Sequence, residues 1–216
     1  MRLVACVNFY QDAEMLRRFL PDLRRKVDYL VCVDGRYTDF PEYDSPQSTD
    51  GSIEVVAKYA DLFIGTPRNR FGIPIPWEDE IAKRTSYLVG QPGDWYLVVD
   101  ADEEIEGIPD RDAIASRPDW LVGLKRVGDA TQPYGIHRCF AHRPGLRYHG
   151  AHHAVHVLGQ IIHPDRIRQD WLPGVTILHH QMERDAERVE RKGEYYAKLA
   201  PSERVFRQAV GLGGGA

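Results

Sequence analysis

The chain of 216 residues is 43% hydrophobic and 28% charged, an ordinary composition for a globular protein with enough apolar side chains for one substantial core. Its formal net charge of -4 at pH 7 argues against a broad, non-specific nucleic-acid-binding surface. No apolar run approaches the roughly 20 residues that span a bilayer, so we expect no transmembrane segment.

The first hundred residues alternate between strand-like and helix-like patterns. Apolar runs predict four buried strands, at 2–7, 29–33, 62–64 and 95–99. Apolar residues at helical spacing predict helices at 13–25, 53–59 and 78–89. Such alternation implies an α/β fold with a mostly parallel central sheet and helices on its faces.

This regular alternation stops after residue 102. The acidic segment 103–112 is expected to be turn-like, followed by a short helix at 113–117. Strand-like runs follow at 120–127, 134–141, 146–157 and 175–178, and a charged amphipathic helix at 183–199. With no evident linker, we expect a single domain over 1–205, a smaller mixed subregion in its second half, and a flexible tail at 206–216.

The three cysteines, Cys6, Cys32 and Cys139, are widely spaced and fit neither a zinc pattern nor a disulfide framework. Two of them lie within apolar runs, so we expect buried, reduced thiols. Reduced thiols favour a cytoplasmic location.

Polar side chains stand where the predicted strands end, at Asn8, Asp34, Asp100 and Asp102. In sheets of this class, ligands bind beyond the carboxyl ends of the strands. On an extended backbone the carboxylates of Asp100 and Asp102 would point the same way, and paired carboxylates suit Mg2+ or Mn2+. The alternative is that these acids only cap the following turn or helix.

Several further pieces occur in a particular order along the chain: 33–35 (Val-Asp-Gly), 48–52 (Ser-Thr-Asp-Gly-Ser), 83–84 (Lys-Arg), 94–104, 138–140, 147–153 and 177–180. In this order, over roughly residues 2 to 200, the chain resembles the GT-A-fold, family-2-type glycosyltransferases. These enzymes use nucleotide sugars and carry an Asp-x-Asp motif. The resemblance implies a GT-A fold, with a nucleotide-sugar-binding half at 1–104 and an acceptor and metal-completing half at 105–205.

The resemblance also implies a donor, a nucleoside diphosphate sugar linked to UDP or GDP. Asp34 would bind the edge of the nucleobase, and the loop from Asn8 to Tyr10 would line the same pocket. Asp100 would hold the ribose or a metal-bound water, with Ala101 beside it. Lys83 or Arg84 would face the diphosphate.

A divalent cation, Mn2+ or Mg2+, is the implied cofactor, with Asp102 as ligand and Asp100 as a second candidate. His179 or His180 would be a further ligand. Adjacent strand residues point to opposite faces, so only one of the two histidines can reach the metal, and His179 matches the family position better. The alternative is that both are ordinary strand-end histidines.

The sequence departs from the family at the expected catalytic base. Relatives often carry His-Glu after a Tyr-x-Gly segment, whereas the matching residues here are His153 and Ala154. Three explanations remain open: His153 is the base; an acid elsewhere, Asp129 or Glu103, serves; or the chain binds a nucleotide sugar with little transfer. Otherwise Glu103 and Glu104 are interpreted as loop or helix-start acids with a scaffolding role. On the acceptor side we expect Arg138, Tyr148 and His152.

Two arginine-bearing segments remain. The Pro/Gly-rich loop 66–76, with Arg68 and Arg70, either orders over the donor or is a plain solvated loop. The helix bearing residues 184–191 is expected to face solvent, with no partner assigned. The histidines between 149 and 156 lack the spacing of a zinc site.

The sequence thus predicts a metal-dependent, inverting glycosyltransferase of hexosyltransferase type. Its acceptor is a protein, a glycan, a small molecule or a modified nucleobase, and its oligomeric state is open. The alternative is a non-catalytic or weakly active nucleotide-sugar-binding module. A nucleotidyltransferase is disfavoured because the Gly-rich, basic opening loop is missing.

Overall fold

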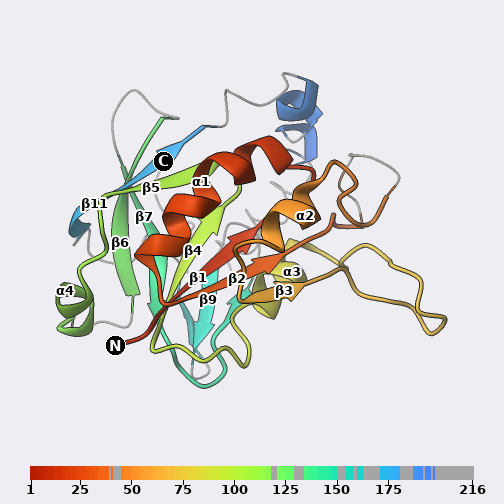
Figure 1. Ribbon diagram of the computed structural model, residues 1–216. Coiled ribbons are helices and arrows are strands. Elements are labelled where there is room, and N and C mark those ends of the chain that lie inside the picture. The colour runs from red at the N-terminus through yellow and green to blue at the C-terminus, as the bar shows by residue number, and fades with distance from the viewer. Residues whose placement is uncertain are drawn as a thin grey trace.

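The computed structural model describes residues 1–38, 40, 45–117, 121–128, 134–149, 154–157, 160–162, 171–180, 187–191, 193–195 and 197. Its described strands form an eight-stranded sheet in the order β3-β2-β1-β4-β7-β6-β11-β5 and a three-stranded sheet in the order β10-β9-β8. Figure 1 shows α1 and α2 in front of the large sheet, with α3 behind it.

The first half follows the predicted alternation closely. Its elements are β1 (Leu3–Asn8), α1 (Ala13–Lys26), β2 (Tyr29–Val33), α2 (Ser52–Val56), β3 (Leu62–Ile64), α3 (Glu80–Ser86) and β4 (Trp95–Asp100). Strands β3, β2, β1 and β4 are mutually parallel. Their carboxyl ends therefore lie at one edge of the sheet, as the sequence predicts.

The second half contains β5 (Glu103–Glu106), α4 (Arg111–Ala115), β6 (Leu121–Val127), β7 (Tyr134–Ala141), β8 (Arg147–His149), β9 (Ala154–Val157), β10 (Gln160–Ile162) and β11 (Trp171–His179). Strand β7 runs antiparallel to both β4 and β6, whereas β11 is parallel to β6. The predicted α/β fold with a mostly parallel sheet is confirmed. The small subregion is an antiparallel sheet.

The expectation of a turn at 103–112 is wrong for its first four residues. Strand β5 pairs antiparallel with β11, which places Ile105 opposite Ile177. Glu103 and Ile105 are buried while Glu106 is exposed. One inward position is a glutamate, so the two-residue alternation of a half-buried strand was hidden in the sequence.

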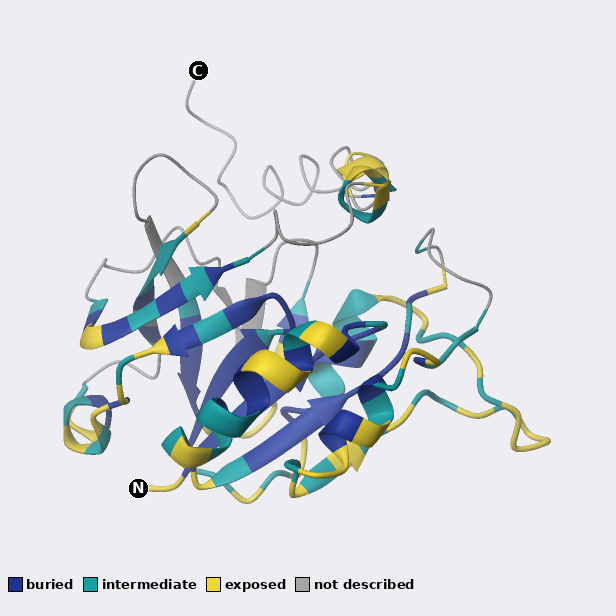
Figure 2. Ribbon diagram, turned by 45° about the horizontal axis from the view of Figure 1, so that its top comes forward, coloured by how far each residue is buried: buried dark blue, intermediate teal, exposed yellow. Residues whose placement is uncertain are grey.

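Two apolar layers cover the faces of the large sheet, whose central strands are coloured as buried in Figure 2. Leu3, Ala5 and Val7 of β1 pack in one layer with α1 and α2. Val4 and Cys6 point to the opposite layer, which contains Tyr87 and Leu88 after α3. This alternation explains why β1 and β4 are apolar at nearly every position: both faces are buried.

The three cysteines are buried and unpaired, and burial raises the pKa of the Cys139 thiol to about 12. None of the helices in the described part of the chain combines the length and the apolar character needed to cross a bilayer.

Candidate functional site

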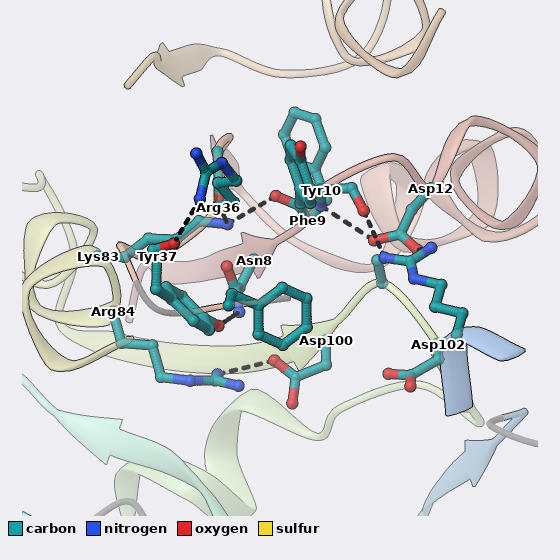
Figure 3. A pocket seen from close by; sticks show the side chains of 14 residues that line it. Asn8, Phe9, Tyr10, Asp12, Arg36, Tyr37, Lys83, Arg84, Asp100 and Asp102 are labelled. Atoms are coloured by element: carbon teal, nitrogen blue, oxygen red, sulfur yellow. Dashed lines mark hydrogen bonds and ion pairs between the residues drawn. The ribbon is translucent and has the colours of Figure 1, made fainter. Parts of the chain in front are cut away.

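An open pocket lies at the carboxyl ends of β1, β2 and β4 (Figure 3). The chain leaves β1 into α1 on one face of the sheet and enters β4 after α3 on the other, so β1 and β4 border the topological switch point. Asn8 and Asp100, the last residues of these strands, are register partners. The pocket is lined by Asn8, Phe9, Tyr10, Asp12, Gly35, Arg36, Tyr37, Phe40, Lys83, Arg84, Asp100, Ala101, Asp102 and Arg188.

Asn8 points a buried amide into this pocket. Its Nδ2 donates to the Tyr37 hydroxyl over 3.5 Å, and its Oδ1 is buried without a hydrogen-bond partner. Leaving a buried polar atom unsatisfied costs about 1–3 kcal/mol. Such an atom at a pocket wall is suited to accept from a ligand donor, such as a base or sugar N–H or O–H.

Four aromatic side chains form the wall around Asn8: Phe9, Tyr10, Tyr37 and Phe40. Tyr37 and Phe40 meet edge to face, with centroids 5.3 Å apart. The Tyr10 hydroxyl donates to the Ser45 carbonyl at 2.6 Å. Rings held in this way offer apolar faces on which a planar base can stack.

Lys83 connects the loops that follow β1 and β2. Its Nζ donates to the carbonyls of Phe9 at 2.7 Å and Gly35 at 2.5 Å, and lies 5.7 Å from the Tyr37 ring centroid. Burial lowers its pKa to about 7, against the opposing effect of the Asp34 carboxylate. Lys83 does line the pocket, but its contacts make it a support of both walls.

The Asp100 carboxylate lies between two buried arginines. Arg84 and Arg138 each reach one of its oxygens at 2.7 Å, and Arg84 also pairs with Glu80 at 2.7 Å. Charge-assisted contacts of this kind are short and directional. To act as a metal ligand or ribose acceptor, as predicted, Asp100 would have to exchange one of these contacts.

Glu103 extends this network away from the pocket. Its side chain is fully buried, contacts Arg138 at 2.9 Å and Arg126 at 3.4 Å, and accepts from the Asp100 amide at 2.9 Å. Three arginines thus balance three carboxylates in one chain of contacts. Glu103 lies in strand β5 and not in a loop, and its contacts with two arginines argue against a role as catalytic base. The same contacts are consistent with the scaffolding role that the sequence suggested. Arg138 likewise lies inside the network rather than facing an acceptor.

Asp34 is fully buried beneath the pocket and accepts from the Ser48 amide at 3.0 Å and the Ser48 hydroxyl at 2.6 Å. Burial raises its pKa despite these hydrogen bonds. The next residue, Gly35, has φ +112°, and a Cβ there would lie 2.3 Å from the Thr66 side chain. Asp34 therefore anchors Ser48 to the end of β2 through both carboxylate oxygens, and its contact with a nucleobase stays a prediction.

Asp102 occupies the opposite wall. The chain turns at 101–102, so the expectation that Asp100 and Asp102 share an extended backbone is wrong. Asp102 instead lies 3.3 Å from His179 Nε2, while His180 Nε2 lies 3.4 Å from Glu104. The two histidines thus face different carboxylates, and His179 is the one beside Asp102.

The Asp102 and His179 pair fits a divalent cation in part. No cluster of three or more His, Cys, Asp or Glu side chains suited to a metal occurs within the described residues. One carboxylate nevertheless suffices when phosphate oxygens and water complete the shell, as is usual for Mg2+ at nucleotide sites, and the His179 imidazole would add a nitrogen ligand. The backbone of Gly128 packs directly against that of His179, since a Cβ at position 128 would lie 2.2 Å from the His179 carbonyl oxygen.

Arg188 is a pocket residue that the sequence did not indicate. It donates to the carbonyls of Tyr10 at 2.5 Å and Gln11 at 2.8 Å, and to Asp12 at 2.9 Å. Tyr195 follows on the same segment and packs its ring 5.2 Å from Phe40. The helix is mostly solvent-facing, as expected, with Glu187 and Glu190 exposed, but its Arg188 reaches the pocket, which the sequence did not indicate.

The loop contacted by Arg188 is backbone-strained. Gln11 has φ +53°, the one positive φ at a non-glycine position in the described part of the chain. Its side-chain oxygen accepts from the amides of Thr49 and Asp50 at 3.0 and 3.1 Å. Strained residues persist where surrounding contacts hold them, and here three segments converge beside the pocket.

Tyr148 does not lie at the pocket. Its ring is buried against Tyr87 and Phe140, each 6.2 Å away between centroids, and burial raises its pKa to about 12. The predicted acceptor-side role is therefore not supported by its position. Asp129, His152 and His153 fall outside the described residues.

Several lining residues, among them Phe9, Gly35, Arg36 and Tyr37, follow the ends of β1 and β2 directly. Their position after predicted strands could have indicated them, because strand ends form the ligand edge of such sheets. Arg188 had no such signal, since its helix reaches the pocket from the far end of the chain.

No protein-family model matches the chain, and no curated protein matches it significantly. Among solved structures, S. aureus TarS aligns at 20% identity and a TM-score of 0.41, over 63% of this chain and 23% of its own. TarS 1–349 aligns at 19% identity and a TM-score of 0.44, over 62% of this chain and 39% of its own. The mannosyltransferase PcManGT from Pyrobaculum calidifontis, in complex with GDP-Man and Mn2+, aligns at 18% identity and a TM-score of 0.38, over 58% of this chain and 35% of its own. The chain therefore spans well under half the length of these proteins.

Proposed function

We propose that this chain is a nucleotide-sugar-dependent glycosyltransferase of GT-A type. The observation that carries the proposal is the position of Asp102, which lines the aromatic, arginine-containing pocket at the switch point and lies 3.3 Å from His179. Of the two aspartates at 100 and 102, Asp102 thus lies beside an imidazole at the ligand edge of the sheet.

The pocket suits the two chemical parts of a nucleoside diphosphate. The ring wall around Asn8 fits a base, and the unpaired Asn8 Oδ1 accepts one of its donors. Four cationic side chains, Arg36, Lys83, Arg84 and Arg188, share the lining with three carboxylates, Asp12, Asp100 and Asp102. A bound divalent cation would turn this nearly balanced lining into one that favours a diphosphate.

Asp102 and His179 would hold that cation, and Mn2+ and Mg2+ are the candidates. When bound, it supplies Lewis-acid stabilisation of the departing diphosphate. The protein's own contribution is to fix the ligands: Gly128 packs under His179, and the Asp102 carbonyl accepts from the His180 amide at 2.8 Å.

Inverting transfer of a hexosyl group requires a base that takes the proton of the acceptor hydroxyl. The burial of Glu103 between Arg126 and Arg138 argues against it in that role. His153 and Asp129 stay candidates for the base, and His152 for the acceptor side.

Thermal unfolding with a panel of UDP, GDP and their sugars, with and without Mn2+, tests donor binding. A ligand at 100 times its Kd adds about 2.7 kcal/mol to stability, which corresponds to roughly 5–10 °C in Tm for a chain of this size. Asp102→Ala should abolish the part that depends on Mn2+. Asp112→Ala, an exposed acid in α4, is the matched control and should keep it.

Turnover separates the transferase from a binding module of the same fold. The burial of Asp100 and Glu103 among arginines favours the module, because two acids of the Asp-x-Asp region are already neutralised. Mass-spectrometric detection of donor hydrolysis or transfer above background, lost in Asp102→Ala, supports the enzyme. Binding without turnover supports the module, and absence of both contradicts the proposal.

A further inference from the structure

The segment 66–76, here called the arginine hairpin, projects from the edge of the large sheet. It leaves the end of β3 and returns to Trp77, and its bridge joins Arg68 to Pro74. Figure 1 shows it as an excursion beyond the edge of the sheet, and Figure 2 colours its tip as exposed.

The tip presents apolar and cationic side chains together. Phe71 is 71% exposed and Ile73 57%, and Ile75 is also exposed at 38%. Arg68 and Arg70 are exposed beside them, with the Arg70 guanidinium 4.7 Å from the Phe71 ring centroid. The segment contains no Asp or Glu, so this arm is locally positive on a chain of net charge -4.

Much of the backbone of the tip is paired within the hairpin, where the Gly72 carbonyl also accepts from the Arg68 guanidinium at 2.6 Å. The Asn69 side-chain oxygen accepts from the amides of Phe71 at 2.9 Å and Ile73 at 3.1 Å, and the Gly72 amide donates to the Asn69 carbonyl at 2.9 Å. The Ile75 amide donates to the Pro67 carbonyl at 2.9 Å. Internal pairing of this kind is what a segment needs in order to enter a medium that offers few hydrogen bonds.

The return arm cannot add a strand from a protein partner. Pro74 and Pro76 have no amide hydrogen, and the amides of Ile73 and Ile75 are already donated inside the hairpin. Strand addition depends on main-chain hydrogen bonds along an open edge. What the arm offers instead is side chains alone: Ile73 and Ile75 at alternate positions, Phe71 at the turn, and two arginines.

We propose that the arginine hairpin docks this protein onto the surface of an anionic lipid bilayer. Phe71, Ile73 and Ile75 would enter the boundary between headgroups and acyl chains, and Arg68 and Arg70 would contact anionic headgroups. Amphipathic surface elements bind membranes by this combination of apolar burial and charge attraction. A narrow tip also suits a fluid surface better than a second copy of the chain, since a stable dimer buries about 800 Å2 per partner.

Docking there would bring the pocket close to the lipid surface. The base of the hairpin packs on the pocket wall, where Trp77 Nε1 donates to the Asp34 carbonyl at 2.7 Å and the Trp77 amide to the Arg36 carbonyl at 3.0 Å. Membrane docking does not depend on the transfer reaction, and vesicle binding is measured without any nucleotide.

Co-sedimentation of the full chain with vesicles tests the proposal, using phosphatidylcholine alone and phosphatidylcholine mixed with phosphatidylglycerol. The chain should sediment with the anionic vesicles and far less with the neutral ones. Arg68→Gln and Arg70→Gln should each lower partitioning about fivefold, and Phe71→Ser about tenfold. Ile108→Ser is the matched control, because Ile108 is 76% exposed and follows β5, the opposite edge strand of the sheet.

Unchanged circular dichroism melts will show that the variants fold. Three results would overturn the proposal: no sedimentation with either vesicle, equal loss in Ile108→Ser and Phe71→Ser, or a dimer in sedimentation velocity that Phe71→Ser dissociates. The last result would assign the tip to a second copy of the chain. None of them bears on nucleotide binding, which the thermal-shift panel measures separately.

Discussion

The buried network around Asp100 makes a quantitative prediction about stability. Arg138 has a side chain only 5% exposed and contacts Asp100 at 2.7 Å and Glu103 at 2.9 Å. Arg138→Met leaves two buried carboxylates with one arginine each, Arg84 and Arg126. Removing one partner of a buried pair costs about 3–5 kcal/mol. The remaining arginines place this substitution near the lower end, at about 3 kcal/mol.

The coupling between partners distinguishes an ion-pair network from simple packing. Glu103→Gln alone should destabilise the fold, because Arg126 and Arg138 then lose their shared carboxylate. In the double variant Arg138→Met/Glu103→Gln, no unpaired charge is left at position 103. The loss of stability in the double variant should therefore be smaller than the sum of the two single losses by about 1–2 kcal/mol. Arg25→Met, at an arginine whose side chain is 71% exposed, should cost at most about 1 kcal/mol.

Urea unfolding of the four variants and the wild type measures these differences. For a chain of this size about 3 kcal/mol corresponds to a Tm fall of roughly 6–12 °C, a large part of a typical total stability of about 5–15 kcal/mol. Strictly additive losses, or an Arg138→Met cost like that of Arg25→Met, would refute the network as drawn. Arg138 would then be open to the acceptor-side role that the sequence suggested.

The remaining predictions concern the walls of the pocket. Burial lowers the pKa of Lys83 from 10.5 to about 7, so the charged lysine costs stability below pH 7, and this cost fades as pH rises toward 10.5. The stability of the wild type relative to Lys83→Met, measured by urea unfolding, should therefore rise with pH across that window. A difference in stability that does not change with pH would contradict this prediction. Arg188→Met should free the C-terminal helix from residues 10–12, because hydrogen bonds to charged groups contribute about 1.5–3 kcal/mol. The release should be seen as faster hydrogen exchange of the amides at 187–191. Unchanged exchange would show that Tyr195 alone holds the helix. Gly128→Ala should lower the stability of the fold by about 3 kcal/mol, because Gly128 has a φ of +119° and a Cβ there would lie 2.2 Å from the His179 carbonyl oxygen. The same substitution should weaken Mn2+ binding in calorimetry. Gly145→Ala, at a glycine with open space around its Cβ position, should leave Mn2+ binding unchanged.

The first half of the fold was predictable because local patterns and tertiary roles agree there. Strands β1 and β4 are buried on both faces, so their apolar runs identify them directly. The register of the parallel strands then brings Asn8 and Asp100 to the same edge. Strand β5 was missed because its inward Glu103 is neutralised by arginines from β6 and β7, partners that are distant in sequence.

The candidate site was predicted in outline, but the roles of several residues changed. Strand-end position indicated Asn8, Asp100 and Asp102, and the family resemblance added Lys83 and Arg84 of α3; all five line the pocket, while their contacts with a donor stay predictions. It does not say whether a carboxylate is open or already occupied. Asp34 bonds to Ser48 and Asp100 to two arginines, and only the folded chain shows those partners. Arg188 illustrates the same limit, since its charge alternates with others on an apparently solvated helix.

The central claim is that Asp102 and His179 hold a divalent cation beside a bound nucleoside diphosphate. Crystals of the full chain grown with UDP or GDP and Mn2+, and measured for anomalous scattering at the manganese edge, test it most directly. We expect one manganese peak in contact with the Asp102 carboxylate and His179 Nε2, next to diphosphate density in the pocket under Arg188. Nucleotide in the pocket with manganese elsewhere would contradict the metal assignment, and a pocket that takes no nucleotide would contradict the proposed function itself.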